Sequence, residues 1–299
     1  MSTADAAGSE TLLADLELSR GLTIQMTAVG GLGFVVSFAV FTAVFQAATG
    51  RAASFAFAPG VGWWNDALNL LVIAVLATVI LVPHEWLHGL AFRHYGGDPS
   101  YGVGVAHFIL PYAYATSPER FTRNQFLVIL LAPLVVMTAV GVPAMLLLGW
   151  GWLALPLAAN AGGAVADVWM ALTLLGYPAH VGVEDHEKGV RILGRAGDRV
   201  PALSVTNLSW DALAGAAVAA FGLLLLLGIG GPLFLSALGV DSLTVGRPGT
   251  ITYLFSFVNT PDEISLGIGP GILVLGSLLG LCYAFARSYR RRRGPAAGE

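Results

Sequence analysis

The chain is dominated by six apolar runs, each close to or above the roughly 20 residues that a helix needs to cross a bilayer. They are Leu22–Ala48, Ala67–Phe92, Phe126–Leu148, Trp152–Leu175, Ala212–Leu238 and Gly271–Arg287. Only 11% of the 299 residues are charged and 56% are hydrophobic, whereas soluble domains carry about a quarter charged residues. The sequence therefore predicts an all-α polytopic membrane protein with about six transmembrane helices.

The basic residues favour one orientation of these six spans. An even number of spans puts both termini on the same side, and of the 15 Lys and Arg residues only Arg51 and Arg247 then lie on the other side. Because basic residues collect in cytoplasmic loops, we expect a multi-pass protein of the cell membrane with both termini in the cytoplasm. The lipid bilayer is then its first partner, and a net charge of −3 gives no indication of nucleic-acid binding.

The distribution of polar residues predicts a single transmembrane domain at 22–287, with its core at 65–195. A polar N-terminal tail, 1–21, precedes it and a basic cytoplasmic tail, 288–299, follows it. The N-terminal tail is acidic, unlike the start of a signal peptide, and we expect a mobile tail or a short surface helix. The single cysteine, Cys282, excludes an intrachain disulfide and a cysteine-rich metal site.

The second apolar run ends in the sequence His84-Glu85-Trp86-Leu87-His88. Residues four apart share one face of a helix, so His84 and His88 can offer two nitrogens to one metal ion. A zinc hydrolase needs two such ligands and a carboxylate that accepts a proton from water, a role that Glu85 suits. Three ionisable groups near a membrane core are costly without a function, so a metal site is favoured over a chance pattern.

A third ligand is expected because hydrolytic zinc usually has three protein ligands. Within the cores of the predicted spans, the remaining ionisable side chain is Asp167, at the same depth in the fourth span as His84 in the second. The preceding Gly162 and Gly163 would allow the two helices to approach closely. The alternative is a buried aspartate that bonds only to the protein. Asn160, two turns away, either lines the cleft or packs as a buried amide.

The loop between the second and third spans, Arg93–Gln125, contains an alternating stretch that includes Tyr101, Val103 and Val105. This period of two predicts a strand or short hairpin. We expect its exposed edge, with Val103 and Val105, to bind an extended peptide by backbone pairing, and His107 to help polarise the scissile carbonyl. A loop on the membrane surface is the alternative.

Two further histidines, His180 and His186, lie with Asp185 in the loop after the fourth span. They are rivals for the place of third ligand. A solvated polar loop is the simpler interpretation, because such residues are mostly exposed.

Together these motifs resemble the site-2-protease-type intramembrane metalloproteases, and more closely the putative zincin peptidase family of prokaryotic membrane proteins. The resemblance covers roughly residues 65 to 195. It is carried by the stretches His84–Phe92, Tyr101–Gly104, Ala115–Pro118, Leu131–Leu134 and Asn160–Asp167. It implies a Zn²⁺ site of His84, His88 and Asp167 with Glu85 as the catalytic base. The Leu-Asp-Gly sequence of the site-2 family is absent here, because Val168 follows Asp167.

The predicted function is that of an intramembrane zinc metalloprotease, which hydrolyses peptide bonds of membrane proteins or membrane-proximal peptides. Two alternatives stay open. One is a zinc hydrolase that acts on a lipid or small amide, and the other is a non-catalytic membrane scaffold that binds zinc. The oligomeric state is not predicted.

Overall fold

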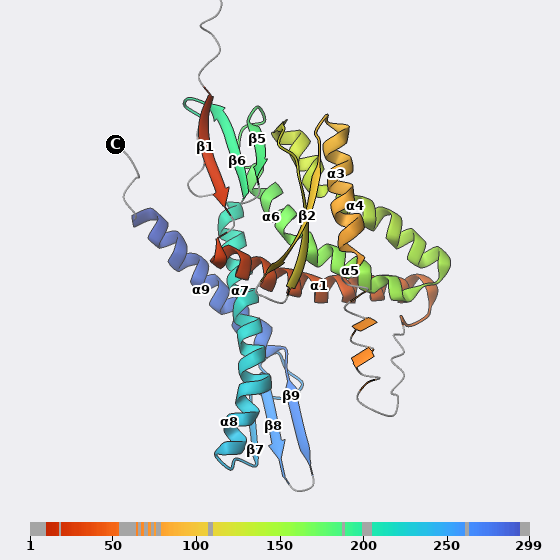
Figure 1. Cartoon of the computed structure of the whole chain (residues 1–299). Helices are drawn as coiled ribbons and strands as arrows, with labels where there is room; N and C mark the ends of the chain where they lie inside the picture. Colours follow the sequence, from red (N-terminus) through yellow and green to blue (C-terminus); the bar gives the residue numbers. More distant parts are fainter. Residues whose placement is uncertain are drawn as a thin grey trace, which may run out of the picture. The chain divides into compact units, whose positions relative to one another are not determined.

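In its described residues the computed structural model is mostly helical, with three small antiparallel sheets, so the chain is not purely all-α (Figure 1). The structure describes residues 10–17, 19–53, 79–106, 110–186, 189–198, 205–260 and 263–293, with isolated positions between 64 and 75. The α-helices in these described residues are α1 (Arg20–Thr49), α3 (Leu81–His94), α4 (Arg123–Leu148), α5 (Ala154–Gly163), α6 (Val165–Leu174), α7 (Val205–Leu225), α8 (Gly231–Ala237) and α9 (Gly271–Arg293).

Five helical segments in the described part of the chain are long and apolar enough to span a membrane. They are Arg20–Thr49, Arg123–Leu148, Gly151–Leu174, Asn207–Ala237 and Gly271–Arg290. The chain therefore fits a multi-pass membrane protein. The predicted span at Ala67–Phe92 is described fully only from residue 79 onward, where α3 forms, and most of its first half lies outside the described residues.

The chain divides into two compact units, each with its own set of contacts. Unit 1 consists of residues 1–19 and 30–202, and unit 2 of residues 20–29 and 203–299. The first ten residues of α1 thus belong to unit 2 and the rest of that helix to unit 1. All of the predicted metal ligands lie in unit 1.

A four-stranded sheet of unit 1 has the strand order β1-β6-β5-β4. Its strands are β1 (Glu10–Glu17), β4 (Arg120–Thr122), β5 (Gly182–His186) and β6 (Gly189–Arg195). Strand β1 differs from the predicted tail: it pairs antiparallel with β6 along its length, and Glu10 forms an ion pair with Arg120 at 2.5 Å. Apolar side chains of β5 and β6 join those of α3, α4 and α6 in one core, which includes Phe92, Phe126 and Ile192.

The predicted hairpin is present as β2 (Ser100–Ala106) and β3 (Leu110–Thr116), which form a two-stranded sheet in the described part of the chain. In their register Tyr101 lies opposite Ala115, and Val103 lies opposite Ala113. The period of two in the sequence therefore predicted the correct local structure. Strand β3 packs beside α3 and brings the hairpin to the helix that carries the histidines.

Local signals in the sequence set the bounds of α4. Thr122 caps its start, since the hydroxyl accepts a hydrogen bond from the Gln125 amide and the Gln125 side chain bonds back to the Thr122 amide. Gly149 caps the end of the helix with a φ of 67°, a left-handed conformation that glycine adopts readily. Pro133 and Pro143 lie inside the helix, as membrane helices tolerate.

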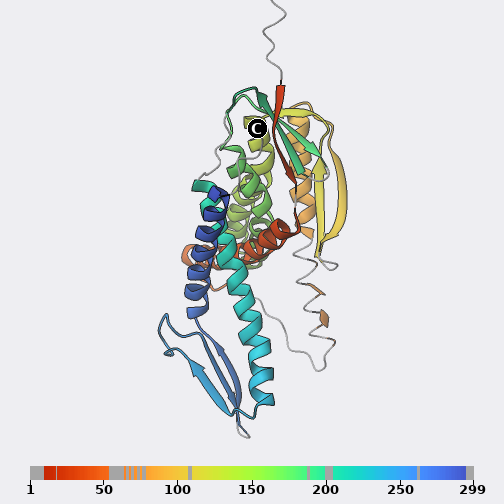
Figure 2. The same cartoon turned by 90° about the vertical axis from the view of Figure 1, so that its left-hand side faces the viewer.

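Unit 2 is built on two helices, α7 and α9, that run side by side (Figure 2). Small residues make this possible, because a methyl group at Gly280 would overlap the backbone of Ala212 and Ala216. A π-helical turn, Leu226–Gly230, links α7 to α8. A three-stranded sheet follows, with β7 (Ser242–Val245), β8 (Phe255–Asn259) and β9 (Ile264–Ile268) in that order.

Candidate metal centre

The two histidines of the motif lie on one face of α3, as the spacing of four predicts. Both are buried, with 6% of His84 and 7% of His88 exposed, and their rings meet edge to face with centroids 4.9 Å apart. The intervening Trp86 is 56% exposed on another face of the helix. The helix therefore directs its two imidazoles into unit 1 and its indole outward.

Asp167 meets both imidazoles from α6. Its Oδ2 lies 3.2 Å from Nε2 of His84, and its Oδ1 lies 3.6 Å from Nε2 of His88. One ligand atom from each of the three residues lies within 4.8 Å of the others. The residues that the sequence predicted as ligands are thus together in space, although 83 positions separate Asp167 from His84.

A break in the fourth span positions this carboxylate. Helix α5 ends at Gly163, Ala164 lies between, and α6 begins at Val165, so Asp167 lies in the first turn of a new helix. The amide groups at a helix N-terminus favour a negative charge. The backbone therefore helps to keep Asp167 ionised inside an apolar segment.

The other nitrogen of each imidazole is held by an oxygen acceptor. Nδ1 of His84 donates to Oδ1 of Asn160, and Nδ1 of His88 donates to the carbonyl oxygen of Ile129, both at 2.8 Å. A proton fixed on Nδ1 leaves the lone pair on Nε2, the atom that faces Asp167 in both residues. Asn160, predicted as a cleft residue or a packing amide, is 1% exposed and orients His84.

Two glycines bring α5 close to α1 within unit 1. A methyl group on Gly30 would meet the carbonyl oxygen of Gly162 at 2.8 Å, and one on Gly162 would meet that of Gly30 at 2.7 Å. Backbones touch at this point, so any larger residue would move α5. Since α5 carries Asn160, the contact fixes the amide that holds His84.

The hairpin covers the face of α3 that carries Glu85. The carboxylate of Glu85 accepts a backbone hydrogen bond from Ala115 in β3. The ring and hydroxyl of Tyr101 in β2 fill the space where a side chain at position 89 would lie, which is open because that residue is glycine. Glu85 is therefore held from the hairpin side, next to the imidazoles.

The remaining predicted site residues have different surroundings. Val103 is 85% exposed on β2. Val105 belongs to the same strand, its side chain lies outside the described part, and His107 lies wholly outside the described residues. The structure thus keeps Val103 on an accessible strand.

Each of the two loop histidines has an acidic partner that does not belong to the predicted metal site. Nε2 of His180 lies 2.8 Å from Asp198, and Nε2 of His186 lies 3.1 Å from Asp15 of β1. Burial raises the pKa of the neighbouring Asp185 to about 7, against the opposing influence of His88. Among the described residues, His84, His88 and Asp167 are the group that can hold a metal ion.

The donor set fits zinc. Two imidazole nitrogens and one carboxylate are the ligands of hydrolytic zinc sites, and each histidine has the hydrogen-bonded Nδ1 that such ligands usually show. Magnesium and calcium favour sets made of oxygen atoms. The sequence could not reveal two parts of this arrangement, the carbonyl of Ile129 and the amide of Ala115, because every residue has these backbone groups.

The fold and the site define a multi-pass membrane protein with a candidate His-His-Asp metal centre. Residues 76–181 match the model of a family described as "Putative zincin peptidase". That stretch contains the two histidines, Glu85 and Asp167, and the match supports a relation to zincins and a metallopeptidase activity. No curated protein and no solved structure matches the chain.

Proposed function

We propose that the protein is an intramembrane zinc metallopeptidase that cleaves peptide bonds of membrane proteins or of peptides close to the membrane. The observation that carries the proposal is the convergence of His84, His88 and Asp167, with both Nδ1 atoms already hydrogen-bonded. The family match over 76–181 supports the class of reaction. The apolar helices around the site support a substrate at or in the bilayer.

His84, His88 and Asp167 would hold the metal ion, and Asn160 and the Ile129 carbonyl keep the imidazoles oriented for it. Bound zinc supplies a water of lowered pKa, about 7 in known hydrolytic sites, and polarises a carbonyl group. Glu85 is one residue from His84 and is held by Ala115. Its carboxylate takes a proton from the attacking water and passes it to the leaving amine nitrogen.

The hairpin supplies the surface on which we place an extended substrate. The amide of Ala115 bonds to Glu85 and therefore points away from β2. Tyr101 and Ala115, which lie opposite each other, thus form a pair that exchanges no hydrogen bonds across the hairpin. Alternation makes Val103–Ala113 another such pair, so the amide and carbonyl of Val103 point to the outer edge of β2. Among the described residues no other strand pairs with that edge, which leaves it available to a peptide backbone.

Substitution Glu85→Gln tests the reaction. The purified full-length protein is incubated with peptides from transmembrane segments, and products are read by mass spectrometry with zinc measured in parallel. General acid–base groups contribute about 10²–10⁴-fold, so we expect cleavage to fall by at least about 100-fold while zinc stays bound. Unchanged cleavage would exclude Glu85 as the base, and a wild-type protein that binds zinc without cleaving any peptide would favour a scaffold.

Substitution Val103→Pro tests the substrate surface, with Val103→Ala as the matched control. Proline removes an outward amide and leaves the inner ladder of the hairpin intact. We expect kcat/KM for peptides to fall by about 10-fold, the equivalent of one lost hydrogen bond, and zinc to remain. Equal kcat/KM in the two variants would contradict strand pairing, as would hydrolysis of small amides alone.

A further inference from the structure

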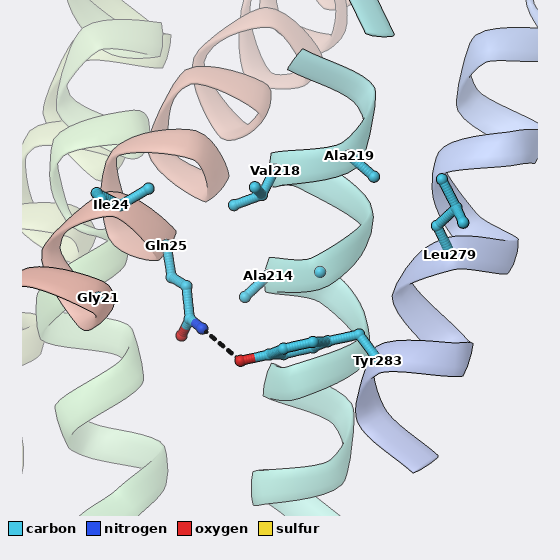
Figure 3. Close-up of a pocket in the computed structure, with 9 residues that line it drawn as sticks. Gly21, Ile24, Gln25, Ala214, Val218, Ala219, Leu279 and Tyr283 are labelled. Carbon is cyan, nitrogen blue, oxygen red and sulfur yellow. Dashed lines mark hydrogen bonds between the residues drawn. The ribbon is translucent and has the colours of Figure 1, made fainter. Parts of the chain in front are cut away.

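Unit 2 contains a groove between α7, α9 and the first turns of α1, with a volume of about 370 Å³ (Figure 3). Buried Ala214 forms its floor, and Ile24, Val218 and Leu279 form an exposed apolar rim. All of its lining residues belong to unit 2. Along most of its length the groove therefore offers an apolar surface, which suits a hydrocarbon chain.

One end of the groove is polar and rigidly built. Nε2 of Gln25 donates a hydrogen bond to the hydroxyl of Tyr283 at 3.0 Å (Figure 3). The guanidinium of Arg287 lies over the Tyr283 ring, 5.9 Å from its centroid, and bonds to the buried Asp211 at 2.6 Å. The indole of Trp210 donates to Gln25 at 3.4 Å. Contacts from three helices thus fix the shape of this end.

Two exposed arginines, Arg20 and Arg290, lie on the same helices as lining residues of the groove, Arg20 directly before Gly21 and Arg290 after Tyr283. Arg20 is four residues before Ile24 on α1, and Arg290 is seven residues after Tyr283 on α9, so each shares a helix face with a lining residue. Neither forms an ion pair with a carboxylate in the described part of the chain. Their charges therefore remain available to a ligand.

We propose that this groove is a binding site for a phospholipid with an anionic headgroup. An acyl chain lies along Ala214, Val218 and Leu279, the ester region lies by Gln25 and Tyr283, and the phosphate contacts Arg20 and Arg290. The order of surfaces along the groove, apolar, then hydrogen-bonding, then cationic, matches the order of groups in such a lipid. A second copy of the chain suits the groove less well. The exposed faces of its α7 and α9 are apolar and would leave the cationic end of the groove without an anionic partner.

The charges should set the selectivity for the headgroup. An arginine near an anionic lipid surface contributes about 1 kcal/mol, which corresponds to about fivefold in affinity. Two arginines predict a preference of roughly 25-fold for an anionic over a zwitterionic lipid with the same acyl chains. Both lipids would use the apolar groove equally.

Native mass spectrometry of the full-length protein in detergent tests the site. Phosphatidylglycerol and phosphatidylcholine with identical acyl chains are titrated in turn, and the occupancy of the first bound lipid gives each affinity. We expect phosphatidylglycerol to bind about 25-fold more tightly. Arg20→Gln with Arg290→Gln should abolish the preference and leave phosphatidylcholine binding unchanged, and the corresponding Lys variants should largely restore it.

A groove-filling variant separates this site from a general attraction to anionic surfaces. Val218→Trp should weaken both lipids at least fivefold, whereas Leu225→Trp, on another exposed part of α7, and Arg247→Gln should weaken neither. Gel filtration confirms that each variant is folded. Equal affinity of the two lipids in the wild type, an unaffected Val218→Trp variant, or a dimer mass in place of bound lipid would overturn the proposal.

Discussion

Each of the two units places an aspartate among apolar helices, buried in the case of Asp211 and partly exposed in the case of Asp167, and the two aspartates have different partners. In unit 2 the carboxylate of Asp211 meets Arg287, a permanent cation. In unit 1 the carboxylate of Asp167 meets two imidazoles, which bring no permanent charge because the ordinary pKa of histidine lies near neutrality. Both arrangements give the carboxylate a partner in an apolar setting, but among the described residues only the group in unit 1 has ligand atoms close enough together to hold a metal ion.

The type of partner distinguishes a structural ion pair, as at Asp211, from a candidate metal site, as at Asp167. The guanidinium of Arg287 cannot lose its proton, so it stays paired with Asp211 as a cation. Histidine nitrogens can exchange a proton for a metal ion, and the Nδ1 hydrogen bonds leave Nε2 available for that purpose. Variants of the two aspartates and of their partners test this difference.

The largest expected effect is on zinc content. Asp167→Asn should lower zinc from about one ion per chain to almost none, because hydrolytic zinc usually needs three protein ligands. Asp211→Asn, the matched change in unit 2, should leave zinc at the wild-type level. Metal analysis of the detergent-purified proteins measures both, and zinc retained by Asp167→Asn would place the third ligand elsewhere, with His186 and Asp185 tested next.

The ion pair of unit 2 is expected to contribute to folding stability. Arg287→Gln leaves the buried carboxylate of Asp211 without its guanidinium. For a fully buried pair this loss lowers the free energy of unfolding by about 3–5 kcal/mol. Because Arg287 is partly exposed, we expect a smaller loss of about 1–3 kcal/mol. Reversible unfolding in mixed micelles gives the value. The variant should still bind zinc, and a loss of zinc would show that the two units depend on each other.

A smaller effect is expected at two side-chain amides, one in each unit. Asn160→Ala removes the acceptor that orients His84, and loss of such a partner typically weakens metal affinity about 10–100-fold. Gln25→Ala, in the polar network of unit 2, should leave zinc affinity unchanged. Competition with a chelator of known affinity measures both variants, and an equal affinity for Asn160→Ala and wild type would reduce Asn160 to a packing residue.

The smallest effect concerns β1, at the edge of the sheet in unit 1. Hydrogen bonds from His186 and then Arg191 hold the pKa of Asp15 below its ordinary value. A lowered pKa stabilises the fold above the ordinary value, and this stabilisation is lost as the pH falls through the folded value, below about pH 4. Amide exchange of residues 10–17, corrected for intrinsic rates, should therefore quicken in acid.

Asp15→Asn provides the control for this prediction. The variant should show the faster exchange of β1 already at neutral pH and little further change in acid. Asp241→Asn in unit 2 should behave as the wild type. If amide exchange still depends on acid in Asp15→Asn, a group other than Asp15 must stabilise the pairing of β1.

The sequence predicted those features that depend on local composition or on a residue type that is rare in its segment. Lengths of apolar runs predicted the five spans found in the described residues, and alternation predicted the β2–β3 hairpin. Asp167 was found because ionisable residues are expensive in an apolar span. These signals act within one segment, so no knowledge of neighbours was needed.

Features that depend on distant partners were missed. Strand β1 reads as a tail because its partner β6 lies far along the chain, and its pairing is visible only in the fold. Asp211 was not identified as a buried charge, because the fifth predicted span starts one residue later and its partner, Arg287, is 76 positions away. The break between α5 and α6 was missed as well, since an alanine marks it.

The position of the three predicted ligands also has a consequence for chain entropy. His84 and Asp167 are separated by 83 positions, so one ion bound to both would close a loop that contains the hairpin and all of α4. Cross-links that close long loops restrict the unfolded chain most, and the single cysteine leaves this chain without an intrachain disulfide. A zinc ion at this site would therefore act as a long-range cross-link between α3 and α6 and would stabilise the fold by restricting the unfolded chain.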